Sequence, residues 1–209
     1  MEADTTGLGL GVTYTEFDIG TEIAAPFGPW HSGEHIGERL AIPGMRSARR
    51  YVAMANPLRF AAVYRGADSD LFRSPAYRAL FDHLSGETRR IMASLKGTRF
   101  IGDVVRENGN GYGALMCRLR VTSAPAADGE LSAWYDEAAE GLLARHGVVR
   151  LTLMTPRRDN ENVSDANCIL LVEGYDLATL KAVGEGGHRI PHALGETTAE
   201  LFQLEHIVI

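Results

Sequence analysis

A chain of 209 residues with 45% hydrophobic and 23% charged residues has the composition of a globular protein that buries its own core. The net charge of −6 comes without a stripe of Lys and Arg, which argues against a nucleic-acid partner. No run approaches the roughly 20 apolar residues that cross a bilayer, so no membrane partner is expected. The acidic start Met1-Glu2-Ala3-Asp4 is unlike a secretory signal, and Cys117 and Cys168 lie in apolar runs. We therefore expect a cytoplasmic protein with two buried thiols.

Periodicity and chain breakers predict the order strand, helix, strand, strand, helix, strand in the first half. The expected strands are Leu8–Phe17, Arg49–Ala55, Arg59–Tyr64 and Arg99–Arg106, and the helices run from Trp30 to Pro43-Gly44 and from Ser74 to Ala93. The two middle strands are expected to join through a tight turn at Asn56-Pro57.

The second half repeats this order. The expected strands are Tyr112–Thr122, Val148–Thr155, Cys168–Gly174 and Phe202–Ile209, and the helices are Leu131–His146 and a glycine-interrupted region Leu177–Leu194. A polar insertion at residues 155–162 explains why the spacing of matched residues changes between the halves. The matched features are the Gly-Glu-Thr tripeptides at 86–88 and 195–197, the strands 60–64 and 169–173, Trp30 with Trp134, and Gly44 with Gly147.

A βαββαβ unit forms a four-stranded antiparallel sheet with both helices on one face. The other face is apolar, and a second copy of the same sheet can cover it. We therefore predict an α+β fold: two tandem ferredoxin-like βαββαβ units packed sheet to sheet as an intrachain dimeric α+β barrel. The predicted units are residues 1–107 and 112–209, joined by residues 108–111. An internal partner sheet suits a monomer that is a pseudo-dimer, although a homodimer is the alternative.

Chemistry-bearing side chains are densest in the first predicted helix, where His31, Glu34, His35 and Arg39 recur at spacings that place them on a shared face. Histidine moves protons near neutral pH, and an adjacent carboxylate can orient its ring. The alternative is a solvated helix face. The H-x-x-E-H pattern at 31–35 also matches a zinc-peptidase motif, but Gly33 lowers its rigidity and a third ligand is missing, so no metal site is expected.

The tryptophan at 30, the Glu-His pair at 34–35, Arg39, the Pro-Gly stop at 43–44 and the Arg-Arg-Tyr run at 49–51 resemble the EthD-like branch of the dimeric α+β barrel superfamily. The resemblance covers residues 8 to 105 well and the second half only in layout. Relatives include cofactor-free monooxygenases, muconolactone-type isomerases, polyketide cyclases and haem-using chlorite dismutase. It implies a ligand cleft between the sheet and the helices.

Carried over to this chain, the resemblance makes His35 the leading proton-transfer residue, with His31 or Glu34 as its partner. Arg39 or Arg50 would neutralise an anionic group or enolate. Candidates for contact with the substrate are Trp30, Tyr14 and Tyr51, for which core or half-buried strand roles are the alternative.

The sequence thus predicts a cofactor-independent enzyme that performs general acid–base chemistry on an oxygenated aromatic, polyketide-like or ring-derived small molecule. The reaction would be that of an isomerase, cyclase, lyase, decarboxylase or cofactor-free monooxygenase. The alternatives are a non-catalytic binding protein of the same fold and a haem-binding protein, for which His83, His188, His192 and His206 are further histidines.

Overall fold

Strands form the centre of the molecule. The computed structural model describes residues 9–122, 128–157, 166–187, 190 and 195–209. Its strands are β1 (Gly11–Asp18), β2 (Met45–Ala53), β3 (Asn56–Gly66), β4 (Lys96–Gly109), β5 (Leu115–Thr122), β6 (Val148–Pro156), β7 (Ala166–Gly174) and β8 (Glu196–Val208). They close into one barrel in the order β1-β3-β2-β8-β5-β7-β6-β4, and every pair of neighbours is antiparallel.

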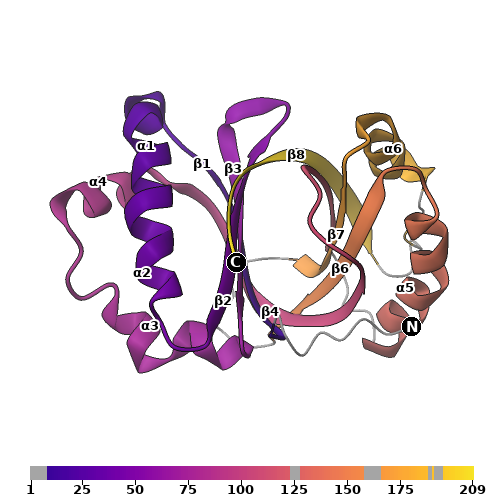
Figure 1. Ribbon diagram of the computed structural model, residues 1–209, viewed down its shortest axis with the longest axis horizontal. Helices are drawn as coiled ribbons and strands as arrows, with labels where there is room; N and C mark the ends of the chain where they lie inside the picture. The colour runs from indigo at the N-terminus through magenta and orange to yellow at the C-terminus, as the bar shows by residue number, and fades with distance from the viewer. Residues whose placement is uncertain (1–8, 123–127, 158–165, 188–189, 191–194) are drawn as a thin grey trace.

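Helices cover two opposite outer faces of this barrel (Figure 1). In the first half they are η2 (Thr21–Ile23), α1 (Ala24–Trp30), the π-helical turn η3 (His31–His35), α2 (Ile36–Leu40), η4 (Ser69–Arg73), α3 (Pro75–Ala79) and α4 (Gly86–Ser94). In the second half they are α5 (Asp128–Leu143), α6 (Leu177–Ala182) and η5 (Val183–Gly187). Among the described residues, no helix combines the length and apolarity that crossing a membrane requires.

The predicted fold class is confirmed. Each half contributes an antiparallel sheet, β4-β1-β3-β2 or β8-β5-β7-β6, with its helices on the outer face. The two inner faces pack against each other, which gives the two ferredoxin-like units in one chain. The proposed boundaries at 107 and 112 stay a prediction. Residues 108 and 109 of the predicted joint are the last residues of β4.

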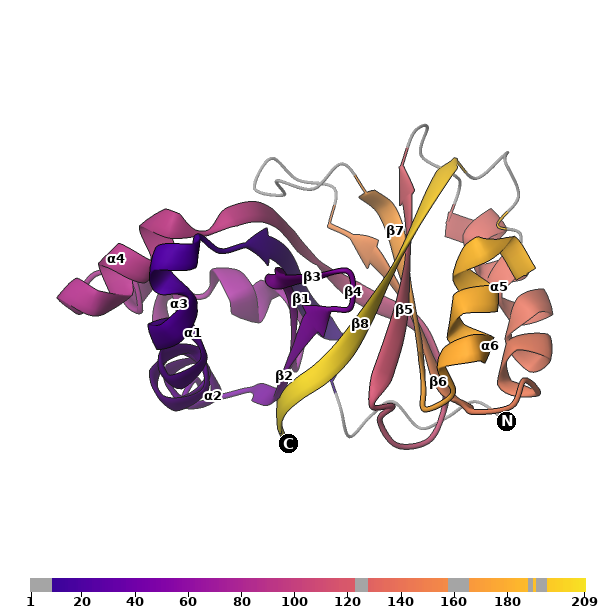
Figure 2. The same ribbon diagram turned by 90° about the horizontal axis from the view of Figure 1, so that it is seen from above.

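Two long strands belong to both halves. Residues 96–103 of β4 pair with β1, and residues 102–109 pair with β6. In the same way β8 pairs with β5 through residues 196–203 and with β2 through residues 202–208. Figure 2 shows both strands running from one half of the molecule into the other. Every edge of each sheet is therefore paired within the described chain.

Alternation along the strands divides the side chains between the barrel interior and the outer faces. In β1, Val12 and Tyr14 point into the barrel, while Thr13 and Phe17 point toward the helices. The interior has an apolar cluster that includes Val63, Phe100, Met116, Leu171 and Phe202. Buried ion pairs accompany it: Arg49 with Glu173, Arg65 and Arg150 with Glu107, and Arg118 with Glu16.

The first helix begins earlier than predicted, at Ala24 instead of Trp30. The helix accommodates two prolines, because proline is tolerated in the first turn, where Pro26 lies, and Pro29 removes only one donor within α1. The backbone then forms the π-helical turn, in which the amide of Ile36 donates to the carbonyl of His31. Such turns hold one extra residue and frequently occur at functional sites.

The predicted helix Ser74–Ala93 is two helices, α3 and α4, separated by residues 80–85. Ser85 ends the connecting segment, because its hydroxyl accepts the amide of Thr88 and so caps α4. The predicted turn at Asn56-Pro57 is also wrong, since Ala53 pairs with Asn56 and the turn is Met54-Ala55. In the second half, the helical region from Leu177 is described as α6 and η5, and most of residues 188–194 and of the predicted insertion lie outside the described ranges.

Replacing Ser85 with Ala is expected to lower the free energy of unfolding by about 1 kcal/mol, because the first turn of α4 loses its cap. Ser85 also donates to Thr88 Oγ1 at 3.0 Å, so the start of the helix loses a second contact. Urea unfolding of S85A and S94A measures the effect. Ser94 lies in the same helix and donates only to the carbonyl of Arg90. Equal stabilities of the two variants would contradict this role for Ser85.

Candidate functional site

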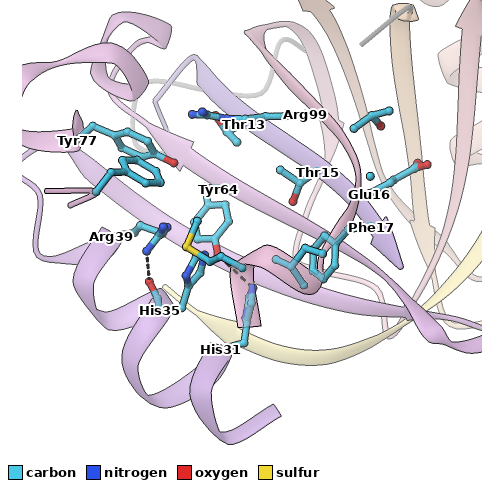
Figure 3. Close-up of a pocket in the computed structure, with 15 residues that line it drawn as sticks. Thr13, Thr15, Glu16, Phe17, His31, His35, Arg39, Tyr64, Tyr77 and Arg99 are labelled. Carbon is cyan, nitrogen blue, oxygen red and sulfur yellow. Dashed lines mark hydrogen bonds between the residues drawn. The ribbon is translucent and has the colours of Figure 1, made fainter. Parts of the chain in front are cut away.

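A pocket of about 280 Å³ lies between the outer face of the first sheet and the helices that cover it. Strands β1, β3 and β4 form one wall, and η3, α2, α3, α4 and the segment after α3 form the other. Figure 3 shows the side chains that converge on it. The lining residues are Thr13, Thr15, Glu16, Phe17, His31, His35, Arg39, Tyr64, Tyr77, Phe81, Met92, Leu95, Gly97, Thr98 and Arg99.

His31 and His35 both line this pocket from the π-helical turn. Their ring centroids are 5.0 Å apart and the ring planes differ by 30°, so the two imidazoles are stacked. The Nε2 atom of His31 is 3.3 Å from the hydroxyl of Tyr64 on β3. The Nδ1 atoms of both histidines are buried and make no hydrogen bond within the described chain. Two buried imidazole nitrogens are therefore left without a hydrogen-bond partner in the described chain.

Burial holds both imidazoles in the neutral form. It lowers the pKa of His31 to about 3, with further contributions from Arg50, Arg39 and His206. Burial also lowers the pKa of His35 well below its ordinary value, and Arg39 and His31 add to this effect. Aromatic rings surround the pair: Phe27 is 5.3 Å from His31 and Trp30 is 4.5 Å from His35, measured between ring centroids. A neutral imidazole at neutral pH can accept a proton.

The lowered pKa values predict a loss of stability under mild acid. The unfolded chain takes up protons near the ordinary histidine pKa of about 6.5, whereas folded His31 does so only near 3. Stability therefore falls as pH falls below about 6.5, by up to about 1.4 kcal/mol per pH unit for each histidine. Urea unfolding between about pH 7 and about pH 5.5 measures the slope, which is expected to decrease in H31Q. The variant Y64F keeps both imidazoles and is expected to retain it. A wild-type unfolding free energy that does not change between these pH values would show that the two histidines are not held neutral in the folded protein.

Arg39 is the third predicted residue in the pocket. Its side chain is 4% exposed and its Nη1 atom donates to the carbonyl of His35 at 3.1 Å. Trp30 is buried behind His35 and donates through its indole to the hydroxyl of Thr88 at 2.9 Å. Glu34 accepts from the same Thr88 hydroxyl and from Ser85. Glu34 thus links the π-helical turn to α4, and its described hydrogen bonds do not include a histidine.

The structure places Arg50, Tyr14 and Tyr51 outside this pocket lining. Arg50 lies behind the helix, where it donates to Ser32 at 3.0 Å and pairs with Glu205 at 3.0 Å. The hydroxyls of Tyr14 and Tyr51 lie in the barrel interior, where they donate to Glu16 and Glu173 respectively. Strand alternation explains their position, since both residues occupy inward-facing positions on β1 and β2.

The polar pocket residues that sequence reasoning did not identify include Thr13, Tyr64 and Arg99. Thr13 is buried and its hydroxyl makes no hydrogen bond within the described chain. Arg99 has a buried Nη2 atom that is likewise without a hydrogen-bond partner there, and its guanidinium lies 5.3 Å from the centroid of the Tyr77 ring. Strand alternation was the available signal for Thr13 and Arg99, because it places them on the same sheet face as Phe17 and Ile101, which face the helices.

A haem does not fit the pocket as it stands. Pockets for drug-sized ligands range from about 300 to 1,000 Å³, and a porphyrin with its propionates is too large for the lower end of that range. The volume of about 280 Å³ lies below it. A metal ion held directly by side chains is a separate question: within the described residues no group of three or more His, Cys, Asp and Glu could hold one. The residues present are better matched to a smaller organic ligand.

The chain has the fold of a dimeric α+β barrel whose two sheets lie in one polypeptide, and its pocket lies on the helix-covered face of the first sheet. Among solved structures it is similar to a protein provisionally named a monooxygenase from Fusobacterium nucleatum, with a TM-score of 0.62, 10% identity and coverage of 95% of this chain and 94% of the other. It is also similar to an anthrone oxidase-like protein, with a TM-score of 0.64, 10% identity and coverage of 97% of this chain and 94% of the other. A third similar structure is a chlorite dismutase variant from Candidatus Nitrospira defluvii, with a TM-score of 0.63, 10% identity and coverage of 96% of this chain and 92% of the other. No family model and no curated protein matches the sequence.

Proposed function

We propose that the protein is a cofactor-independent enzyme that performs general acid–base chemistry on an oxygenated aromatic, polyketide-like or ring-derived small molecule. The observation that carries the proposal is the pair of neutral, buried imidazoles of His31 and His35 in a pocket that also contains Arg39. Perturbed pKa values in a concave site support catalysis over an incidental surface role.

In this proposal His35 accepts the proton from the substrate. It is less buried than His31 and lines the same pocket. His31 stacks against it and lies beside the Tyr64 hydroxyl, so these two groups position His35 and can pass the proton on. The Arg39 guanidinium stabilises the negative charge that develops on an enolate or phenolate oxygen.

In this proposal Trp30, Glu34 and Arg50 position the two histidines. Trp30 packs against His35, Glu34 joins the π-helical turn to α4, and Arg50 holds the same turn through Ser32. Each fixes the backbone that carries the imidazoles, and a small displacement of such groups is costly for catalysis. We assign no substrate contact to Tyr14 or Tyr51, because their hydroxyls bond to carboxylates inside the barrel.

The deprotonated substrate can be reprotonated at another carbon, can lose a leaving group, or can react with O₂. The first two outcomes are isomerase and lyase chemistry, and the third is cofactor-free oxygenation. The names of two structural neighbours, a provisional monooxygenase and an anthrone oxidase-like protein, favour oxygenation. A neutral histidine beside a ring compound serves all three, because each begins with the same proton transfer.

Deuterium exchange separates this enzyme from the alternative, a binding protein without turnover. Ring ketones and phenols, with anthrone among them, are incubated with the protein in D₂O without oxygen, and mass spectrometry follows carbon-bound exchange. Calorimetry measures binding of the same compounds in parallel. An enzyme exchanges protons faster than the buffer for a compound that it binds. Binding without faster exchange across the panel would show a binding protein instead.

The finer assignments are proposals as well. The EthD-like branch and an origin by tandem duplication are supported by the Trp, Glu-His, Arg and Pro-Gly order and by the matching layout of the halves. A cytoplasmic location is supported by Cys117 and Cys168, which are both buried and form no disulfide. A monomer is favoured over a homodimer because each sheet already has its partner within the chain.

A further inference from the structure

Positive charge in the pocket exceeds negative charge. Arg39 and Arg99 line it, and the only carboxylate among its lining residues is Glu16. The oxygens of Glu16 bond to Arg118 and Arg59, so this carboxylate is already neutralised inside the barrel. Arg39 is 3.5 Å from Glu38, but Glu38 is 41% exposed and such pairs are weak. Both histidines are neutral, so the two guanidinium groups determine the charge that a ligand meets.

The two guanidinium groups lie around the same pair of rings. Arg99 is 5.3 Å from the centroid of the Tyr77 ring and Arg39 is 5.9 Å from that of Phe81. The Tyr77 and Phe81 ring centroids are 6.0 Å apart. Arg39 reaches the pocket from α2 and Arg99 from β4, as Figure 3 shows for their side chains. Both arginines therefore lie beside the aromatic wall of one pocket, where a bound anion is attracted by both charges.

Both arginines have donors to spare. Arginine carries five N–H donors, and the hydrogen bond and ion pair of Arg39 in the described chain use only Nη1. The Nη2 atom of Arg99 is buried without a hydrogen-bond partner there, and so is the hydroxyl of Thr13 on the same wall. A buried donor without an acceptor is costly, so a ligand that accepts from these groups gains affinity.

We propose that Arg39 and Arg99 bind a carboxylate of the substrate, so that the pocket takes an aromatic or ring-derived carboxylic acid in preference to its neutral analogue. This proposal rests on the site described under the proposed function and names its substrate class. Guanidinium groups match carboxylates in geometry as well as in charge. The rings of Phe17, Tyr77 and Phe81 supply the apolar walls for the remainder of the ligand.

An anionic ligand also benefits the chemistry. After burial, the charge of Arg39 disfavours the imidazolium form of His35, and a carboxylate bound to Arg39 offsets that charge. The bound acid would therefore bring the histidine closer to the basicity that proton transfer requires.

Calorimetry with 2-naphthoate and 2-naphthamide tests the proposal, because the two compounds share a ring system and shape and differ in charge. The wild type is expected to bind the acid about tenfold or more tightly than the amide. In R99Q and R39Q this preference falls by about tenfold, while affinity for the amide changes little. R99K keeps a positive charge and retains part of the preference. R90Q, an exposed arginine of α4 outside the pocket lining, keeps all of it.

Equal binding of acid and amide by the wild type, binding of neither, or an unchanged preference in R99Q would overturn the proposal. Arg99 is only partly buried, so R99Q decides the outcome even where R39Q does not fold. These measurements require no turnover. Preference for the acid without deuterium exchange would leave the carboxylate site standing and defeat the proposed catalysis. Deuterium exchange without a preference for the acid would support the proposed catalysis and overturn the carboxylate site.

Discussion

Replacing His35 with Gln is expected to reduce proton transfer by about 10²- to 10⁴-fold, which is the contribution that a positioned general base makes. Glutamine keeps a polar side chain of similar size but cannot accept and hold a proton. Binding of the ligand should persist, because Arg39, Arg99 and the aromatic walls remain. Deuterium exchange and calorimetry on the same preparation measure the two quantities. H83Q removes an exposed histidine outside the pocket lining and serves as the matched control.

The pH profile adds an independent check on the role of His35. Burial and Arg39 hold its pKa well below the ordinary value of about 6.5, so the free enzyme keeps its base unprotonated in mild acid. The value of kcat/KM is therefore expected to stay level as pH falls through about 6.5, where an ordinary histidine would lose half its basic form. Exchange by H35Q at the wild-type rate would remove His35 from the mechanism. An equal loss of exchange rate in H83Q would also show that the effect is not specific to His35.

Breaking the buried pair of Arg49 and Glu173 is expected to cost about 3–5 kcal/mol of unfolding free energy, because the remaining charge is left buried without a partner. Both side chains are essentially inaccessible, and Arg49 Nη1 is 2.6 Å from Glu173 Oε1. Burial alone would lower the pKa of Arg49, and Glu173 raises it above its ordinary value. The pair joins β2 of the first half to β7 of the second across the barrel.

Urea unfolding of R49M, E173Q and the double variant R49M/E173L measures this cost. The double variant is expected to be more stable than either single variant, because it leaves no unpaired charge. Y51F provides the matched control: it removes only the 3.0 Å hydrogen bond to Glu173, which is worth about 1–2 kcal/mol. Single variants that lose less than Y51F would show that the pair contributes little to stability.

The repeat made the fold predictable, because it implied two apolar sheet faces that could cover each other. The helical spacing of His31, His35 and Arg39 likewise predicts that these residues share a face, and all three line the pocket. The local sequence pattern did not predict the bounds of the helices correctly. The first helix was predicted from Trp30, whereas α1 already begins at Ala24 and includes Pro26 and Pro29. The hydroxyl of Ser85 caps α4 within the segment that periodicity predicted as one helix.

Long-range pairing accounts for the residues that the sequence did not reveal. Alternation separates Tyr14 from Thr13, but it does not say which face lies under the helices and which lies inside the barrel. Arg99 reaches the pocket because β4 pairs with β1 and sets Arg99 opposite Thr15. Residues this far apart along the chain meet only through the topology, so alternation within β4 was not enough to assign Arg99 to the pocket.

The shared strands β4 and β8 make the two halves mutually dependent. A break in the connection between β4 and β5 would leave each fragment with half of a long strand unpaired, since residues 104–109 of β4 and 204–208 of β8 bond across to the opposite sheet. An unpaired strand recruits a complementary strand. Separately made fragments should thus reassociate into the native barrel, and at high concentration intact chains can exchange halves to form an interlocked dimer.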